Sequence, residues 1–479
     1  MADFTLRAVA MSGESAVGGG GSKYGDFSQL AGGPPIVTIQ GETIAFLGLL
    51  SGGPNHGKLA IWRSSGCIFE PLVMTGDPAP GTAQTFQSLG YPVCCRDGRV
   101  LLLGLLPPGN VSGAWSYKDG QLQLIAYEGQ AAVGVPGATY FTPPGQHPFT
   151  FPPAVAANGQ ACFSSYMKGP SLLKDEGLWT GGLPPVGLAL QSGVTAPNLP
   201  PGVTVDSYIT GPVMNGTGLI AFVATTHNTQ SSGVFFGTAA RWVMVVQQGQ
   251  PAPGTGSTFS GLQGWIPALN DAGMCAFLAD SYVATGIWAN TRGVLQAVAI
   301  NGQPAPGFPA GWTFFGGALN PPLLSANGLV VFWGGAATTT GQSANGLWSW
   351  SADVGLAPIA IGNAIAPGTG GLRYVPGFEL SVCVGEKGDI AFTGYVGASG
   401  GLATGLWYQA VGGTPKLVAL EGQTMVLEGG VTKTLKTLFP MASGGPQNGL
   451  ETGMGSGGEI VFVALFSDGT SAVVASRPV

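Results

Sequence analysis

Charge is what this chain of 479 residues has least of. Only 8% of its residues are Asp, Glu, Lys or Arg, against roughly 25% in an average soluble domain. The 17 Lys and Arg residues are scattered singly and the net charge is −6. Nucleic-acid binding is therefore not expected, because it needs a basic stripe. A surface poor in charge and rich in hydroxyls and amides is typical of proteins outside cells, on virions and on adhesins.

Long apolar runs and targeting signals are also missing. No stretch approaches the 18 or more consecutive apolar residues of a transmembrane helix, so no membrane insertion is expected. The first residues, MADFTLRAVAMSG, have neither the basic region nor the apolar core of a signal peptide. This leaves export without that signal, earlier removal of a leader, release of a virion by lysis, or a cytoplasmic life.

Metal ligands and familiar catalytic motifs are scarce. The three histidines, His56, His147 and His227, lie in different repeats, which argues against a histidine-rich metal site. No G-x-S-x-G context, Walker loop, H-E-x-x-H or EF-hand occurs. We therefore expect no metal and no cofactor.

Six cysteines occur without any C-x-x-C pair, at Cys67, Cys94, Cys95, Cys162, Cys275 and Cys383. Most lie inside apolar strands of different repeats. They are expected to be free thiols that act as small apolar core residues. A disulfide framework or a metal site is the alternative.

Glycine and proline are abundant instead, with 83 Gly and 37 Pro, while 45% of residues are hydrophobic. The apolar runs recur, so Gly and Pro are expected to separate short strands. One segment, seen as LQAVAINGQPAPG at Leu295–Gly307, occurs eight times, and its eighth copy is Phe4–Gly18. A second segment, N-x-x-G-x-x-A-F, also occurs eight times, and its last copy, Gly458–Phe462, lacks the partner that follows the others. The two orphan copies complete each other, as in a closed ring.

Each repeat contains four strand signals. A short P-x-L-N segment leads into a tight turn and the strand of G-x-x-A-F, with Gly supplying the positive φ of the turn. G-hydrophobic-W follows, as in Gly346-Leu347-Trp348, and then the L-x-x-V-A-x-x-G strand. No segment has the 3.6-residue apolar period of a helix.

The sequence thus predicts an all-β chain with a single eight-bladed β-propeller domain, residues 1–479, built of four-stranded antiparallel blades. The repeats are about 55–70 residues long and the longest inserted loop is 422–452. Phe4–Ser12 is expected to close the ring as the outer strand beside Ser471–Ser476. An open β-solenoid is the alternative, but it gives no reason to split one repeat between the two ends.

The N-x-x-G-x-x-A-F element, followed by G-I-W and G-Q-P-A-P-G, resembles the bacterial tandem-repeat proteins named for N-x-x-G-x-x-A-F. The resemblance runs from Phe4 to Arg477. It implies a propeller with a surface or secreted life. It provides no catalytic residues.

The candidate site residues come from loops that depart from the repeat, since the shared P-A-P-G signature is most simply structural. They are Tyr140 and His147 in one loop, Asp206 and Tyr208 in the next, and Arg373 and Tyr374 in a third. Exposed aromatic rings beside polar amides suit a sugar-binding face. The alternative is that these aromatic rings pack their own loops down.

We therefore expect a non-enzymatic binding or structural propeller on a virion, appendage or cell surface. Its loop face would recognise a glycan or a protein partner within a larger assembly. A carbohydrate-active enzyme is the first alternative, with a site at the central channel in which His147, Tyr208 and Arg373 serve a polysaccharide lyase as base, acid and carboxylate clamp. An intracellular scaffold is the second alternative.

Overall fold

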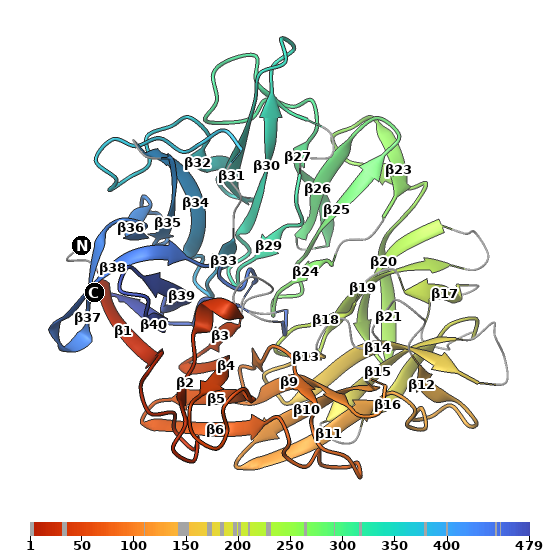
Figure 1. Cartoon of the computed structure of the whole chain (residues 1–479). Helices are drawn as coiled ribbons and strands as arrows, with labels where there is room; N and C mark the ends of the chain where they lie inside the picture. Colours follow the sequence, from red (N-terminus) through yellow and green to blue (C-terminus); the bar gives the residue numbers. More distant parts are fainter. Residues whose placement is uncertain are drawn as a thin grey trace. The chain divides into compact units, whose positions relative to one another are not determined.

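The computed structural model describes residues 4–30, 36–109, 111–141, 153–169, 175–182, 186–194, 199, 203–208, 211–226, 231–262, 266–291, 293–315, 319–377, 381–398, 401–445, 448–450 and 452–479. In these residues the chain is all-β, with eight small antiparallel sheets and no α-helix (Figure 1). The predicted fold class is confirmed: the sheets are the blades of an eight-bladed β-propeller. The chain divides into two compact units of four blades each, which are described in turn.

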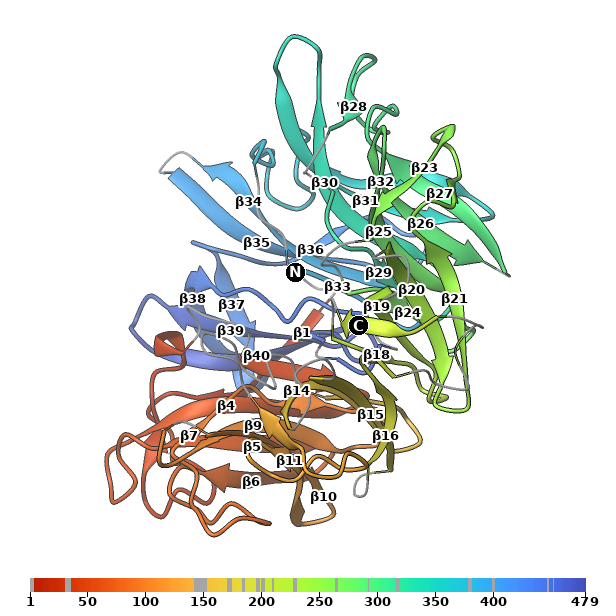
Figure 2. The ribbon, with the colours of Figure 1, turned by 90° about the vertical axis from the view of Figure 1, so that its right-hand side faces the viewer.

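The first unit comprises residues 1–124, 362–446 and 451–479. Its four sheets contain the following strands, the last of them including the N-terminal strand: β2 (Lys23–Tyr24), β3 (Val37–Gln40), β4 (Thr43–Ser51), β5 (Leu59–Ser65) and β6 (Ile68–Met74); β7 (Ser88–Leu89), β8 (Val93–Cys94), β9 (Val100–Leu106), β10 (Val111–Lys118) and β11 (Gln121–Tyr127); β33 (Val382–Val384), β34 (Ile390–Ala398), β35 (Gly401–Gln409) and β36 (Lys416–Leu420); β37 (Thr424–Leu427), β38 (Val431–Leu438), β39 (Ile460–Phe466), β40 (Ser471–Pro478) and β1 (Phe4–Met11). Two short 3₁₀ turns, η1 (Phe27–Gln29) and η2 (Glu428–Gly430), complete it. Figure 2 shows β4, β5 and β6 side by side in the first of these sheets.

The second unit comprises residues 125–361 and 447–450. Its four sheets contain these strands: β12 (Thr139–Phe141), β13 (Ala154–Val155), β14 (Gln160–Lys168), β15 (Glu176–Gly182) and β16 (Gly187–Gln191); β17 (Val205–Tyr208), β18 (Val213–Met214), β19 (Ile220–Thr226), β20 (Ser231–Thr238) and β21 (Arg241–Gln247); β22 (Pro251–Ala252), β23 (Ser257–Gly261), β24 (Ala268–Leu269), β25 (Cys275–Ser281), β26 (Thr285–Thr291) and β27 (Val294–Ile300); β28 (Thr313–Phe314), β29 (Leu323–Leu324), β30 (Val330–Ala337), β31 (Ser343–Ser351) and β32 (Gly355–Ile361).

The expectation of four strands per blade needs a correction. Most sheets have five strands in the described residues, because two short strands share one edge of the G-x-x-A-F strand. In the blade of β19, β17 pairs with its last residues and β18 with its first. The single strand expected at this edge is therefore divided into two.

The N-terminal strand completes the eighth blade. β1 pairs with β40 from Phe4 opposite Pro478 to Met11 opposite Ala472, and the Ser12 amide donates to the Ser471 carbonyl oxygen at 2.8 Å. The red β1 therefore lies beside the blue β40 in Figure 1. The prediction that Phe4–Ser12 is the outer strand of this blade is confirmed.

The G-hydrophobic-W element places a buried tryptophan at one register in six blades. In five of these blades the phenylalanine of the G-x-x-A-F strand lies directly opposite, as in Phe332 opposite Trp348, where the two rings stack with centroids 5.7 Å apart. Opposite Trp115 the residue is Leu102. A β-bulge falls next to the tryptophan, between Leu347 and Trp348. The glycine two residues earlier makes room for the ring, since a Cβ on Gly346 would lie 2.5 Å from the Trp348 ring.

Each of these six tryptophans donates its indole N–H to a backbone carbonyl of the P-A-P-G loop that enters its blade, and the carbonyl is at the equivalent position in every loop. The oxygen belongs to the residue before the last glycine of the motif, and the distances are 2.8–3.1 Å. The pairs are Trp62 with Val17, Trp115 with Pro80, Trp179 with Val133, Trp288 with Pro253, Trp348 with Pro306 and Trp407 with Pro367. We call this arrangement the indole clamp. It accounts for the P-A-P-G signature, which was expected to be structural.

The final glycine of the loop belongs to the same arrangement. Gly307 has φ +90°, and a Cβ there would lie 2.8 Å from Pro358 of β32. Gly368 has φ +76°, and its Cβ would lie 2.7 Å from Leu417 of β36. Glycine alone fits because the loop both bends through positive φ and lies against the outer strand.

The asparagine that opens the N-x-x-G-x-x-A-F element ties consecutive blades in the second unit. The Asn215 side-chain oxygen accepts from the Leu219 amide within its own turn, and its nitrogen donates to the Asn270 carbonyl at 2.9 Å. Asn270 repeats this one blade on, donating to the Ser325 carbonyl at 3.1 Å. Both asparagines are buried, so their polar atoms are satisfied between blades.

The packing of glycine against tryptophan predicts a double-mutant cycle. Gly346→Ala should lower the free energy of unfolding by about 1–3 kcal/mol, because its new methyl group overpacks against Trp348. Trp348→Phe alone should also destabilise, since it leaves the partly buried Pro306 carbonyl without its donor. In the double variant the cost of Gly346→Ala should fall by about 1 kcal/mol or more, because a smaller ring leaves space for the methyl group.

Urea unfolding of the three variants measures the coupling. Gly182→Ala is the control, because a Cβ there has nothing within 4 Å. Additive costs in the double variant would contradict the packing account.

All six cysteines are free thiols, five of them buried, while Cys67 is exposed in the turn between β5 and β6. Cys67 thus differs from the expected core thiol because its turn faces solvent. Burial raises the pKa of Cys94, Cys275 and Cys383 to about 12. These thiols are therefore both inaccessible and uncharged at neutral pH.

Iodoacetamide at pH 8 should accordingly add one alkyl group to the native protein, at Cys67. After denaturation without reductant, six groups should be added. Intact-mass analysis counts them. Two or more adducts on the native protein would contradict the burial of the other five, and fewer than six after denaturation would reveal a disulfide.

Candidate functional site

Two of the residues expected to form a binding face, Tyr140 and Tyr374, are core residues. Their side chains are only 1% and 2% exposed. Each ring meets a clamp tryptophan edge-on, Tyr140 with Trp179 at 5.0 Å and Tyr374 with Trp407 at 5.1 Å between centroids. The expectation that these rings form an exposed platform is wrong, and the alternative that they pack their own loops is what the structure has.

The reason lies in a position that recurs in other blades. Tyr24, Phe86, Phe259 and Phe314 meet their tryptophans in the same edge-on geometry, at 4.7–5.1 Å. Each of these aromatic residues follows the last glycine of its P-A-P-G element by a few residues. The irregular lengths of the loops hid this shared position.

The tyrosine phenol also holds the loop. The Val133 amide donates to the Tyr140 phenol oxygen at 3.4 Å, and the Val17 amide donates to that of Tyr24 at 3.3 Å. Burial raises the pKa of Tyr140 to about 12. The phenol therefore stays protonated at neutral pH, and its oxygen accepts the hydrogen bond from the loop amide.

The other predicted residues are dispersed. Arg373 is exposed in the first unit, and its Nη1 donates to the Asn363 carbonyl of its own loop at 2.7 Å. Asp206 and Tyr208 lie on β17 of the second unit, where Asp206 is exposed and the Tyr208 backbone pairs with Ala224. His147 lies outside the described residues. Within the described part of the chain, these residues do not form one cluster: Arg373 lies in the first unit, and Asp206 and Tyr208 lie in the second.

The longest inserted loop is largely structural. It forms the hairpin of β37 and β38 joined by η2. Further on, the Asn448 carbonyl accepts from the Met214 amide at 3.0 Å and the Gly449 carbonyl from the Val155 amide at 3.2 Å. These residues of the loop thus belong to the core of the second unit.

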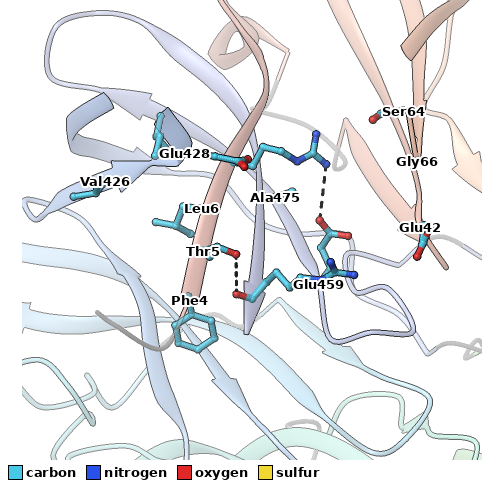
Figure 3. A pocket seen from close by; sticks show the side chains of 13 residues that line it. Phe4, Thr5, Leu6, Glu42, Ser64, Gly66, Val426, Glu428, Glu459 and Ala475 are labelled. Atoms are coloured by element: carbon cyan, nitrogen blue, oxygen red, sulfur yellow. Dashed lines mark hydrogen bonds and ion pairs between the residues drawn. The ribbon is translucent and has the colours of Figure 1, made fainter. Parts of the chain in front are cut away.

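A pocket of about 700 Å³ in the first unit lies beside the closing strand β1. Figure 3 shows it between β1 and the turns of the neighbouring blade. The charged and hydroxyl side chains that line it are Thr5, Arg7, Glu42, Ser64, Glu428, Glu459 and Arg477. Leu6, Leu427 and Ala475 give it an apolar base. Its volume falls within the roughly 300–1,000 Å³ of small-molecule sites.

Opposite charges meet in this pocket. Arg7 Nη2 lies 3.9 Å from Glu459 Oε1, as the dashed line in Figure 3 marks. The Glu459 side chain is 17% exposed and that of Arg7 45%. Desolvation raises the pKa of Glu459, and the nearby Glu42 adds to this, while Arg7 and Arg477 oppose it.

Three further charged side chains line the pocket and make no hydrogen bond to the described part of the protein. Within the described residues the side chains of Glu42, Glu428 and Arg477 make no hydrogen bond or ion pair. Acceptors and donors are therefore both available to a ligand. The described residues contain no group of three His, Cys, Asp or Glu side chains that is placed to hold a metal ion.

Sequence reasoning missed this pocket because its residues occupy variable positions. Arg7 replaces the glutamine seen as Gln123 and Gln296 in other copies, and Glu459 aligns with Leu219 and Met274. The available signal was the split repeat itself. Only at the closing blade do residues from both ends of the chain form one wall.

A family model matches residues 39–479 of the chain. The chain belongs to this family of unknown function, DUF7453. No curated protein matches it. The resemblance to the N-x-x-G-x-x-A-F proteins stays a prediction. The DUF7453 match covers six whole blades and most of the other two, which are the blade of β2–β6 and the blade that β1 completes.

Among solved structures, the DUF7453 chain is similar to a puromycin-hydrolyzing peptidase of Mycobacterium tuberculosis, with 12% identity, TM-score 0.39, and 96% of this chain and 61% of that chain covered. It is similar to the β-propeller domain of the Trilobed protease from Pyrococcus furiosus, with 8% identity, TM-score 0.38, and coverage of 83% and 96%. It is also similar to polysaccharide lyase Uly1, with 10% identity, TM-score 0.34, and coverage of 99% and 98%. The chain spans about three fifths of the peptidase. At these TM-scores the likenesses carry no argument about activity.

The described part of the DUF7453 chain holds no helix of the length and apolar character that crossing a membrane requires.

The position of Tyr374 in the core predicts how two adjacent substitutions differ. Tyr374→Ala should lower the free energy of unfolding by about 3–5 kcal/mol, as for other buried aromatic rings. Tyr374→Phe should cost much less, because Phe259 and Phe314 occupy the same place in other blades. Arg373→Ala should stay within about 0.5 kcal/mol of the wild type.

Thermal and urea unfolding measure these differences. An unchanged melting temperature for Tyr374→Ala would contradict the core position of Tyr374 and make it a candidate binding residue again.

Proposed function

We propose that this chain is a non-enzymatic binding propeller that recognises a glycan in the pocket beside β1 and is displayed on a cell surface, appendage or virion. The observation that carries the proposal is the lining of the pocket. Guanidinium, carboxylate and hydroxyl groups surround about 700 Å³ with an apolar base, and several of them are free to bond a ligand.

Sugars suit such a lining for a simple chemical reason. Each sugar hydroxyl both donates and accepts a hydrogen bond, so its site needs acceptors and donors side by side. Glu42 and Glu428 offer acceptors, while Arg7 and Arg477 offer donors. The C–H faces of the sugar ring would lie against the apolar base. The position is rigid, because the pocket is built on paired strands.

The sparse charge of the whole chain supports display outside the cell, where hydroxyl-rich surfaces are common. A protein partner is the other ligand class for this propeller. A pocket of small-molecule size favours the glycan, because protein partners bury roughly 800 Å² on each side of a much flatter interface.

A carbohydrate-active enzyme is a second candidate, favoured by one observation. Glu459, whose pKa is raised by desolvation, shares the pocket with Glu42. Glycosidases work with a pair of carboxyl groups, of which the acid has a raised pKa. In this candidate Glu459 would protonate the glycosidic oxygen and Glu42 would act as base or nucleophile. This candidate uses other residues than the polysaccharide lyase alternative, which was built on His147, Tyr208 and Arg373.

The two candidates separate in one experiment on the full chain. Glycan-array binding and isothermal titration measure association, and a reducing-end assay on the bound glycans measures cleavage. We expect binding without any new reducing ends. Cleavage that is lost in Glu459→Gln, with binding retained, would establish the enzyme instead. Binding of no glycan on a broad array would refute the proposed function.

A further inference from the structure

We infer that the pocket takes a neutral, hydroxyl-rich saccharide, and that it exists only while the N-terminal strand is docked, so that the ligand holds the eighth blade closed. The inference rests on the proposed function, because it names the ligand class of the same site and adds a dependence on β1.

The walls of the pocket come from segments far apart in the chain. β1 contributes Thr5 and Arg7, the start of β39 and the end of β40 contribute Glu459 and Arg477, and η2 contributes Glu428. The turns of the neighbouring blade contribute the rest, including Glu42. β1 is held by its pairing with β40. Its departure would therefore remove one wall and leave Glu459 without Arg7.

The charges favour a saccharide without acidic groups. Three carboxylates and two guanidiniums give the pocket a formal charge of −1, and the whole chain carries −6. Two of the carboxylates, Glu42 and Glu428, have no cationic partner among the described residues, whereas Arg7 already faces Glu459. A uronate or sulfate group would meet more negative than positive charge, which costs binding energy at short range.

Arg7 is the residue that couples the ligand to the strand. Its guanidinium has five N–H donors, and its contact with Glu459 at 3.9 Å is too long for a hydrogen bond. In the described residues this side chain makes no other hydrogen bond or ion pair, so its donors are available to a ligand in the pocket. A sugar hydroxyl bound there would connect β1 to Glu459 and to the opposite wall at Glu42.

Mass action then links binding to closure. A ligand that binds only the closed blade stabilises it in proportion to the logarithm of its concentration over its dissociation constant. The melting temperature should rise with ligand, and the backbone amides of β1 should exchange more slowly, because detachment of the strand first requires release of the ligand.

The test uses full-length protein with matched hexasaccharides. The neutral probes are cellohexaose, mannohexaose and galactohexaose, and the acidic probe is hexagalacturonate. Isothermal titration gives affinities, and hydrogen exchange with mass spectrometry follows the peptide that covers residues 4–11. We expect at least one neutral probe to bind and to slow exchange in that peptide, and hexagalacturonate to do neither.

Arg7→Ala should weaken the neutral probe roughly tenfold or more, the effect of losing one or two hydrogen bonds to a charged group. Its unliganded melting temperature should stay close to that of the wild type, because Arg7 is half-exposed. Arg7→Lys, which keeps the charge but loses the planar fork, provides a second variant. Arg241→Ala, at an exposed position on β21 outside the pocket, is the control and should bind normally.

The outcomes separate the inference from the proposed function. A neutral saccharide that binds equally well to Arg7→Ala, without slowing exchange in β1, would place the site elsewhere and overturn the inference while the binding function stands. Tighter binding of hexagalacturonate would overturn the ligand class. Binding of no saccharide by any of these measurements would overturn both.

Discussion

The indole clamp is the interaction on which the regular parts of this protein depend. In six blades a buried tryptophan donates its N–H to a backbone carbonyl of the loop that enters the blade. The loop would otherwise run over the surface with its backbone free to move. Because the bond joins the loop to a central strand, each entering loop is fixed at one point, and the short strand that follows it begins in a defined place.

Other features of the repeat follow from the size of the indole ring. In most blades the ring has a glycine two residues before it, a bulge beside it and an opposite aromatic ring to stack on, as at Gly405, Trp407 and Phe392. Trp62 has Ala60 in place of the glycine, and Trp115 has Leu102 in place of the opposite ring. The fourth blade shows how the arrangement tolerates change. There Phe235 stands at the tryptophan position and stacks on Phe222 at 5.3 Å, while Trp242 of the next strand meets Phe222 edge-on at 5.4 Å. The aromatic volume is kept although the tryptophan has moved to another strand.

Much of the fold could be predicted from the sequence, because the repeat is a local pattern and the split eighth copy marks where the chain meets itself. The pairing of β1 with β40 follows from the split repeat. The divided inner strand could not be predicted in the same way, since both short strands are only two to five residues long and leave little pattern. The site was harder still. Tyr140 and Tyr374 stood out because their loops are irregular, yet their rings serve the regular clamp. Arg7, Glu42 and Glu459 are unremarkable in sequence, and only the closed blade brings them together.

Hydrogen exchange of the indole protons tests the clamp most directly. In a ¹H–¹⁵N spectrum, single Trp→Phe variants assign the signals of Trp62, Trp115, Trp179, Trp288, Trp348 and Trp407. All six indole N–H groups are buried and bonded to a carbonyl, so they should persist after transfer to D₂O and exchange only when their blade opens. Exchange of these six signals as fast as that of a solvent-exposed indole, in a protein that stays folded, would contradict the account.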